Sequence, residues 1–187
     1  IFILLSTWKK GSELVSEQRR KINMTLRKFV NELSPTIPRI SGTAIYLSSS
    51  AGLVPSRLFY NLKHYKVLHE QLIFLHVDNE EIPYVLEEER LKVVGLAPGL
   101  YTIAVRFGFR EEPDLNKALQ HTSKYQLNIP ADATFFVART SVVSCEGILS
   151  RWRCNLFAWM MRQSESAATY FRLMPTQVVE VGTQVSL

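Results

Sequence analysis

Two short apolar runs separated by a helical segment constrain the fold more than any other feature of this sequence. Residues 43–47, Thr-Ala-Ile-Tyr-Leu, lie between Gly42 and three serines, which is typical of a buried strand. Pro55 suits the first turn of a helix, where its missing N–H has no partner to lose. Apolar side chains then recur at helical spacing: Leu58, Phe59, Leu62 and Tyr65. Residues 71–77, Gln-Leu-Ile-Phe-Leu-His-Val, then predict a second strand, so the order predicts a right-handed β-α-β unit and an α/β fold.

The rest of the chain extends this pattern to a single α/β domain with a mixed central sheet. Residues 91–96 and 101–109 flank the turn sequence Ala-Pro-Gly and predict a β-hairpin. Asp114 can cap a short helix, and residues 134–140 form another apolar run. The last elements expected are a long helix with Leu149, Trp152, Leu156, Trp159 and Met160 on one face, and a final strand over residues 178–185.

The excess of positive charge lies in one part of the chain. The 187 residues carry a formal charge of +5, and residues 1–39 hold eight basic and three acidic side chains, so the remainder is neutral. A neutral body argues against a nucleic-acid partner, which requires a basic face on the folded domain itself. Cys145 and Cys154 are too few for a disulfide framework or a closed zinc site, and we expect two reduced thiols.

The basic N-terminal arm has the residue order of a membrane exit. Residues 1–5 are apolar, and Trp8 and then Lys9 and Lys10 follow. Five residues cannot cross a bilayer, which requires roughly 20, but the lysines would place the following chain in the cytoplasm by the positive-inside rule. An ordinary amphipathic helix with an apolar end explains the arm equally well. The residues expected at a membrane surface are Trp8, Lys9, Lys10, Arg19 and Arg20.

The same arm predicts one polar helix within residues 8–33, because this stretch contains no proline and its apolar residues have a partly helical spacing. Residues 34–39 contain two prolines and predict an extended linker. The globular body is expected to begin near residue 40.

Two polar stretches are candidate ligand sites, and neither has the residues of a catalytic or metal centre. Asn61 and His64 lie at the polar end of the first helix, where they could contact a ligand or only lead into the next strand. Histidines five apart on a helix point about 140° apart, which disfavours a metal shared by His64 and His69. Ser48, Ser49 and Ser50 follow the first strand, where a phosphate could rest on exposed amides, although a simple loop explains them as well.

Aromatic and methionine side chains surround most of the last long helix. They include Trp152, Phe157, Trp159 and Met161. Core packing accounts for one such face, and the remaining apolar width predicts a contact with a second copy or with the underside of a membrane domain.

Several sequence blocks resemble the Kup-type potassium transporters in the family's order. The blocks are residues 42–47, 54–56, 61–70, 106–114, 135–136, 156–160 and 178–185, together with Thr7-Trp8-Lys9-Lys10-Gly11. The resemblance implies that residues 1–39 are the end of the last transmembrane helix and a basic amphipathic linker helix, and that residues 40–187 are a cytoplasmic α/β domain.

The resemblance also implies a function at the inner or plasma membrane. The expected function is a regulatory and dimerisation domain of a proton-coupled potassium importer, in which an absent membrane part carries out potassium:proton symport. The expected partners are the membrane domain of the same polypeptide, the membrane surface and a second copy. A domain that senses a nucleotide, such as a cyclic dinucleotide, is the alternative. A nucleotide cyclase is the third hypothesis, because that activity is claimed for distant plant relatives, but the sequence contains no two-metal carboxylate site. We therefore expect neither an enzyme nor a cofactor.

Overall fold

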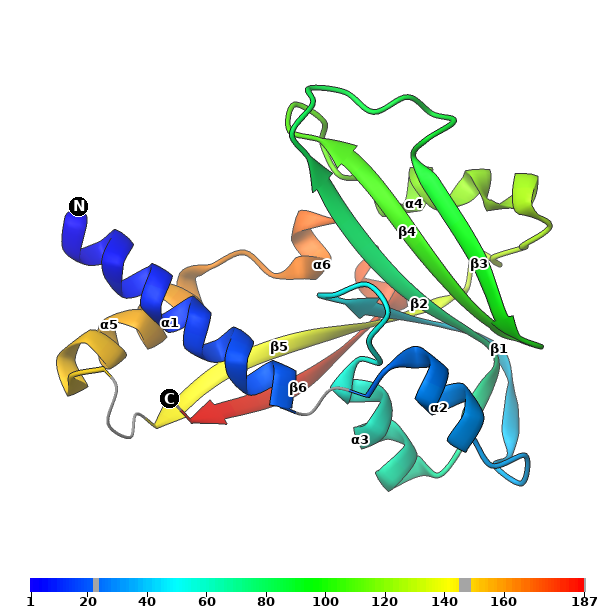
Figure 1. The fold of residues 1–187 in the computed structure, drawn as a ribbon, viewed down its shortest axis with the longest axis horizontal. Helices are drawn as coiled ribbons and strands as arrows, with labels where there is room; N and C mark the ends of the chain where they lie inside the picture. The colour runs from blue at the N-terminus through cyan, green and yellow to red at the C-terminus, as the bar shows by residue number, and fades with distance from the viewer. Residues whose placement is uncertain (22–23, 145–148, 187) are drawn as a thin grey trace.

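A six-stranded sheet lies at the centre of the molecule (Figure 1). The computed structural model describes residues 1–21, 24–144 and 149–186; for residues 19–21, 143–144 and 186 it describes the backbone only. The strands are β1 (Arg39–Ser48), β2 (Leu68–Glu80), β3 (Leu91–Ala97), β4 (Leu100–Gly108), β5 (Thr134–Ser144) and β6 (Val178–Ser186). Their order in the sheet is β3-β4-β2-β1-β5-β6, and only the β3–β4 pair is antiparallel.

Two of the described helices precede the first strand, and the others lie in the connections between strands. The helices are α1 (Phe2–Lys21), α2 (Leu26–Glu32), α3 (Ser56–Tyr65), α4 (Leu115–Leu119), α5 (Arg151–Gln163) and α6 (Ala167–Tyr170), with the 3-10 turns η1 (Gln120–Tyr125) and η2 (Pro175–Gln177). Asp114 caps α4 by accepting the amide of Lys117 at 3.0 Å, as predicted.

The predicted α/β class is confirmed, and so are its main parts. β1, α3 and β2 form the parallel β-α-β unit, and β3 and β4 form the hairpin. Gly99 in the hairpin turn has a positive φ of 74°, and a Cβ atom there would overlap the carbonyl oxygen of Glu70. The long helix α5 and the final strand β6 are also present.

Alternate residues of the sheet face two different layers. On one face α2 and α3 cover Ala44, Tyr46 and Phe74. On the other face α4, η1 and the segment around α6 cover Ile45, Leu47 and their neighbours in a larger cluster. Because layers cover both faces of the sheet, residues 44–47 of β1 and 72–75 of β2 are all buried. This explains why these two stretches are continuously apolar.

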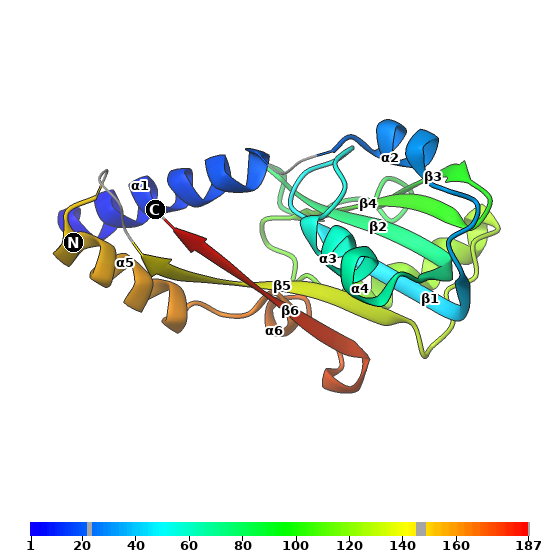
Figure 2. The ribbon, with the colours of Figure 1, turned by 90° about the horizontal axis from the view of Figure 1, so that it is seen from below.

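A third apolar cluster lies away from the body. β1 pairs with β5 only through residues 134–136, but β5 and β6 continue together to Ser144 and Ser186 as a two-stranded ribbon. Figure 2 shows this ribbon reaching α1 and α5. The buried residues that meet there, which we call the arm cluster, are Leu14, Val15, Leu149, Cys154, Phe157 and Val185.

The helix predicted within residues 8–33 is wrong in its extent. The structure has two helices, because Thr25 takes an extended conformation (φ −71°, ψ 148°) and its hydroxyl accepts the amide of Lys28 to start α2. Thr25 also bridges to Leu53, so a tertiary contact fixes the break. α1 begins earlier than predicted, at Phe2.

Two further predictions are corrected. Cys154 is buried and disulfide-bonded, so the prediction of a reduced thiol is wrong there; Cys145 lies outside the described residues. The apolar face predicted for the last helix is confirmed only in part. Leu149, just before α5, is buried and Met160 packs against the arm cluster. Trp152 and Trp159 are instead 56% and 52% exposed, and the buried side chains of α5 are Cys154 and Phe157. The reason is that α1 packs over the Phe157 side of α5.

Candidate functional site

One candidate ligand site is a groove between α3 and β6, which we call the aromatic groove. Its volume is about 560 Å³, within the range of roughly 300 to 1,000 Å³ common for small-molecule sites. Residues from β1, α3, the start of β2, β5 and β6 line it. They are Ile40, Tyr46, Tyr60, Asn61, His64, Tyr65, Val67, His69, Phe136 and residues 179–182.

Two stacked rings form a rigid part of its lining. Tyr46 on β1 and Phe136 on β5 are side by side in neighbouring strands, with ring centroids 4.5 Å apart and planes inclined by 6°. The side-chain amide of Asn61 on α3 donates to the Tyr46 hydroxyl at 2.6 Å. Burial raises the pKa of Tyr46 to about 12, and the Asn61 hydrogen bond and the Arg57 charge oppose this only in part. Tyr46 therefore keeps its proton at neutral pH.

Two histidines and one ion pair complete the polar part of the groove. His64 lies on α3, whereas His69 lies on β2 and contacts Phe136 edge-on at 6.0 Å. The 140° angle expected between two histidines on one helix does not apply, because His64 and His69 lie on different elements and both line the same groove. Burial lowers the pKa of His69, which favours a neutral ring. Glu180 on β6 accepts from Arg139 on β5 at 3.3 Å.

The chemistry of the groove suits binding. Within the described ranges, no group of three or more His, Cys, Asp or Glu side chains lies close enough together to hold a metal ion. A flat ligand could stack on aromatic side chains and hydrogen-bond to Asn61.

The serines that we predicted as ligand residues do not join this groove. Ser48, Ser49 and Ser50 line a separate cavity of about 50 Å³ at the other end of α3. The Ser48 hydroxyl donates to the carbonyl of Ser50 at 2.7 Å and accepts the amide of Ser50 at 3.3 Å. The loop therefore uses its own polar groups, whereas Asn61 and His64 face the larger space.

The residues predicted to make a dimer or transport-domain contact separate into two sets. Trp152 and Trp159 lie exposed on α5. Phe157 is fully buried under α1, where its ring lies 5.6 Å from that of Trp8, and Met161 packs partly buried against the arm cluster. Of the four residues, the two tryptophans therefore have the most exposed surface with which a partner could make contact.

The helix α1 is held on α5 by polar and close apolar contacts. Thr7 is fully buried and its hydroxyl accepts from Nε of Arg153 at 3.0 Å, while another guanidinium nitrogen donates to Ser6 at 2.9 Å. A Cβ atom on Gly11 would overlap the ring of Phe157. A glycine inside a predicted helix was the one signal in the sequence for such a close approach.

The predicted membrane-surface residues lie along α1. Residues 1–5 of the chain are exposed and apolar, Trp8 is 38% exposed, and Lys9 and Lys10 are exposed. Arg19 and Arg20 belong to α1, but their side chains are outside the described part. Among the described helices, none has the length and apolar character that a membrane span requires.

Sequence patterns did not reveal a buried ion pair near the hairpin. Arg90 donates to Glu111 through two nitrogens, at 2.7 and 3.2 Å, and also pairs with Glu87 at 2.9 Å. The hydrogen bond from Arg90 holds the pKa of Glu111 below its usual range, and the amide of Gly108 reinforces this. The pair joins the segment after β2 to the segment after β4, which is a structural role.

The fold and the groove describe an α/β domain without a catalytic constellation in its described residues, and comparison with known proteins identifies its family. The family model of the K+ potassium transporter C-terminal domain matches residues 41–187, and the chain belongs to this family. The resemblance to Kup-type transporters is thereby confirmed.

The relatives are longer proteins. The chain is 40% identical to the probable potassium transport system protein Kup of Zymomonas mobilis and 37% identical to the probable Kup 2 protein of Chromobacterium violaceum. Both matches cover the whole chain but only 29% and 31% of the relatives, so the chain spans about three tenths of their length. These relatives are named as transport proteins, which agrees with the expectation of a non-enzyme. No solved structure matches the chain.

Proposed function

We propose that this chain is the cytoplasmic regulatory and dimerisation domain of a proton-coupled potassium importer at the inner or plasma membrane. Residues 1–39 would join it to a membrane part of the same polypeptide, and residues 40–187 would form the domain proper. The ion-binding residues would lie in the membrane part. The family assignment and the small share of each relative that the chain covers support this proposal.

The observation that carries the proposal is the attachment of α1. Its exposed apolar start, followed by Trp8, Lys9 and Lys10, fits a helix that emerges from a bilayer. Arg153 and the close packing at Gly11 hold this helix rigidly on α5. A movement of the membrane part would therefore be transmitted to the domain through a stiff helix, and the reverse would also hold.

The partner surface that we propose is the exposed side of α5. Trp152 and Trp159 are seven residues apart, so they lie on the same face of the helix. Two half-exposed tryptophans on one face provide a large apolar area, and tryptophan is enriched at the centres of interfaces. A second copy is the partner that we expect there, and the transport domain is the other.

Photocrosslinking in membranes tests this surface. A photoreactive amino acid at position 159 of the full-length parent protein should give a crosslinked dimer. The control position is Tyr125, which is also about half exposed but lies on η1. A crosslink within one polypeptide from position 159 would replace the dimer by a transport-domain contact, and no crosslink at all would remove both.

Potassium uptake by the same parent protein tests the regulatory part. Replacing Arg153 by Met removes the donor to Thr7 and Ser6, so uptake should respond although no ion-path residue changes. Unchanged uptake rate and affinity, with α1 shown to be loosened, would contradict regulation through this contact.

The aromatic groove supports a second candidate function, the sensing of a nucleotide such as a cyclic dinucleotide. Exposed aromatic rings beside an amide are suited to a nucleobase. Tyr60 and Tyr65 line the groove at 39% and 72% exposure, every base has a π-face, and Asn can form two hydrogen bonds with adenine. Asn61 and His64 would contact the ligand. The groove is favoured over the Ser48–Ser50 loop, whose cavity is about ten times smaller.

Calorimetry with cyclic dinucleotides and adenine nucleotides tests the second function. We expect binding to the unmodified chain and at least about tenfold weaker binding to an Asn61→Ala variant. A matched control is Asn116→Ala, on the other face of the sheet. Flat titrations with the unmodified chain would exclude nucleotide sensing without affecting the transport proposal.

A further inference from the structure

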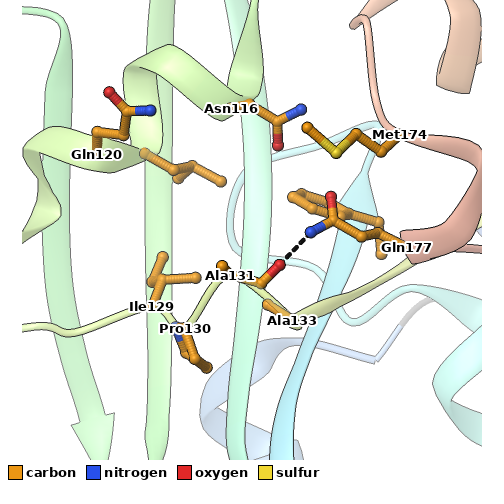
Figure 3. Close-up of a pocket in the computed structure, with 10 residues that line it drawn as sticks. Asn116, Gln120, Ile129, Pro130, Ala131, Ala133, Met174 and Gln177 are labelled. Carbon is orange, nitrogen blue, oxygen red and sulfur yellow. Dashed lines mark hydrogen bonds between the residues drawn. The ribbon is translucent and has the colours of Figure 1, made fainter.

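A second cavity lies on the opposite face of the sheet from the aromatic groove (Figure 3). Its volume is about 300 Å³, and it is lined by α4, η1, the start of β5 with the segment before it, and η2. Phe135 is part of its lining, whereas the adjacent Phe136 lines the groove, because successive residues of β5 face opposite sides. The two sites are therefore separate.

The lining of this cavity contains no charged side chain. Leu119, Ile129 and Phe135 provide apolar surface, and Met174 adds a flexible side chain from the rim. The polar side chains are all carboxamides: Asn116, Gln120 and Gln177. A charged ligand would lose its hydration here without a compensating opposite charge, so the lining favours a neutral one.

One of these carboxamides has an unused acceptor. The Nε2 group of Gln177 donates to the carbonyl of Ala131, which fixes the orientation of the side chain (Figure 3). Its Oε1 atom is buried, and no donor among the described residues reaches it. Asn116 extends toward the same space from α4, with its amide donating to the carbonyl of Arg172 at 3.2 Å. A buried carbonyl oxygen normally has a donor, so Oε1 of Gln177 marks where a ligand's donor would be placed.

We infer that this cavity binds a small neutral molecule with a compact apolar body and an N–H donor, such as a carboxamide or lactam, whose N–H group donates to Oε1 of Gln177. The apolar body lies against Leu119 and Phe135. This inference is independent of the proposed transport and nucleotide functions, because it concerns the other face of the sheet.

Three probe compounds test the chemistry. Benzamide has an apolar ring and an N–H donor, acetophenone has nearly the same shape without the donor, and benzoate has the ring with a negative charge. In NMR spectra of the isotope-labelled 187-residue chain, benzamide should shift the backbone amide signals of Leu119 and Ala133. Acetophenone should bind about tenfold more weakly, and benzoate should not bind.

Two outcomes would overturn the inference. Equal binding of benzamide and acetophenone would remove the role of the Gln177 acceptor. If none of the probes shifts these signals at millimolar concentration, the cavity is filled by water alone and no ligand of this class binds.

Matched variants locate the site. Gln177→Met keeps the length of the side chain but removes the acceptor, so it should abolish the preference for benzamide over acetophenone. The control is Gln163→Met at the exposed end of α5, which should leave the preference unchanged. Ala131→Leu fills the cavity from its exposed rim and should weaken the binding of both probes. A preference that survives in the Gln177→Met chain would refute the assignment.

Discussion

The contact between α1 and α5 predicts that Gly11→Ala destabilises the chain, although alanine is the better helix former. In an exposed helix the change would stabilise by about 1 kcal/mol. Here the added Cβ atom would overlap three ring carbons of Phe157, which is fully buried. Overpacking of this kind costs about 1–3 kcal/mol, so the net loss is up to about 2 kcal/mol if α1 stays in place.

Hydrogen exchange and urea unfolding together measure this effect. The amides of α1 should exchange faster in the Gly11→Ala chain, and the midpoint of unfolding should fall. Gly182→Ala is the matched control, since no atom lies within 4 Å of a Cβ there. Adding Phe157→Leu should recover part of the loss, because the smaller side chain relieves the overlap. A Gly11→Ala chain that is more stable, with slower exchange in α1, would refute the close packing.

Three further predictions concern buried polar groups. Because folding raises the pKa of Tyr46 to about 12, the free energy of unfolding should fall as pH rises above 10. In a phenolate absorbance titration, the step at the highest pH should be absent in Tyr46→Phe. Glu111 has a lowered pKa, so its pairing with Arg90 stabilises the chain at neutral pH, and this stabilisation is lost as pH falls below about 4.3. Glu111→Gln should lower the free energy of unfolding in urea by about 3 kcal/mol at pH 7. If the stability of the variant and of the unmodified chain fell in parallel with acid pH, the prediction would be wrong. Arg153→Met should cost about 1–3 kcal/mol by leaving the Thr7 hydroxyl without its donor, which equal unfolding midpoints would exclude.

The strands could be predicted from the sequence because each has a local signal. Residues 44–47 and 72–75 are continuous apolar runs, and the turn at Gly99 fixes the hairpin by its positive φ. The order of the strands has no such signal, since the pairing of β1 with β5 joins residues about 90 positions apart. The length of the β5–β6 ribbon was also missed, because it depends on α1 and α5 covering its end.

The break at Thr25 shows why the first helix was mispredicted. Its apolar residues keep a helical spacing across residues 8–33, so periodicity alone extends the helix. Threonine is suited to start a helix through its hydroxyl, but the sequence does not reveal that Thr25 also bridges to Leu53. A tertiary contact therefore decided between two local preferences.

The groove was only half predictable. Asn61 and His64 were candidates because polar residues cluster at the end of α3, but the opposite wall comes from Phe136 and β6, which follow much later in the chain. Tyr46 had the signal that was missed, because a tyrosine inside a buried strand requires a partner for its hydroxyl. For α5, helical spacing identified the apolar residues but not which of them face the core. Gly11 decides this, because its missing side chain lets Phe157 pack under α1.

The strand β6 joins the two regions on which the proposed functions depend. Its residues 179–182 line the aromatic groove, and Val185 of the same strand packs in the arm cluster with Leu14 and Phe157. β6 is an edge strand that pairs with β5 alone, so it has fewer backbone restraints than the strands inside the sheet. A ligand that moved β6 would therefore also move Val185, and through it the arm cluster that holds α1. It could bias α1 only by as much as its affinity differs between the two positions of the strand, so regulation through the groove requires a ligand that contacts β6 and not only α3.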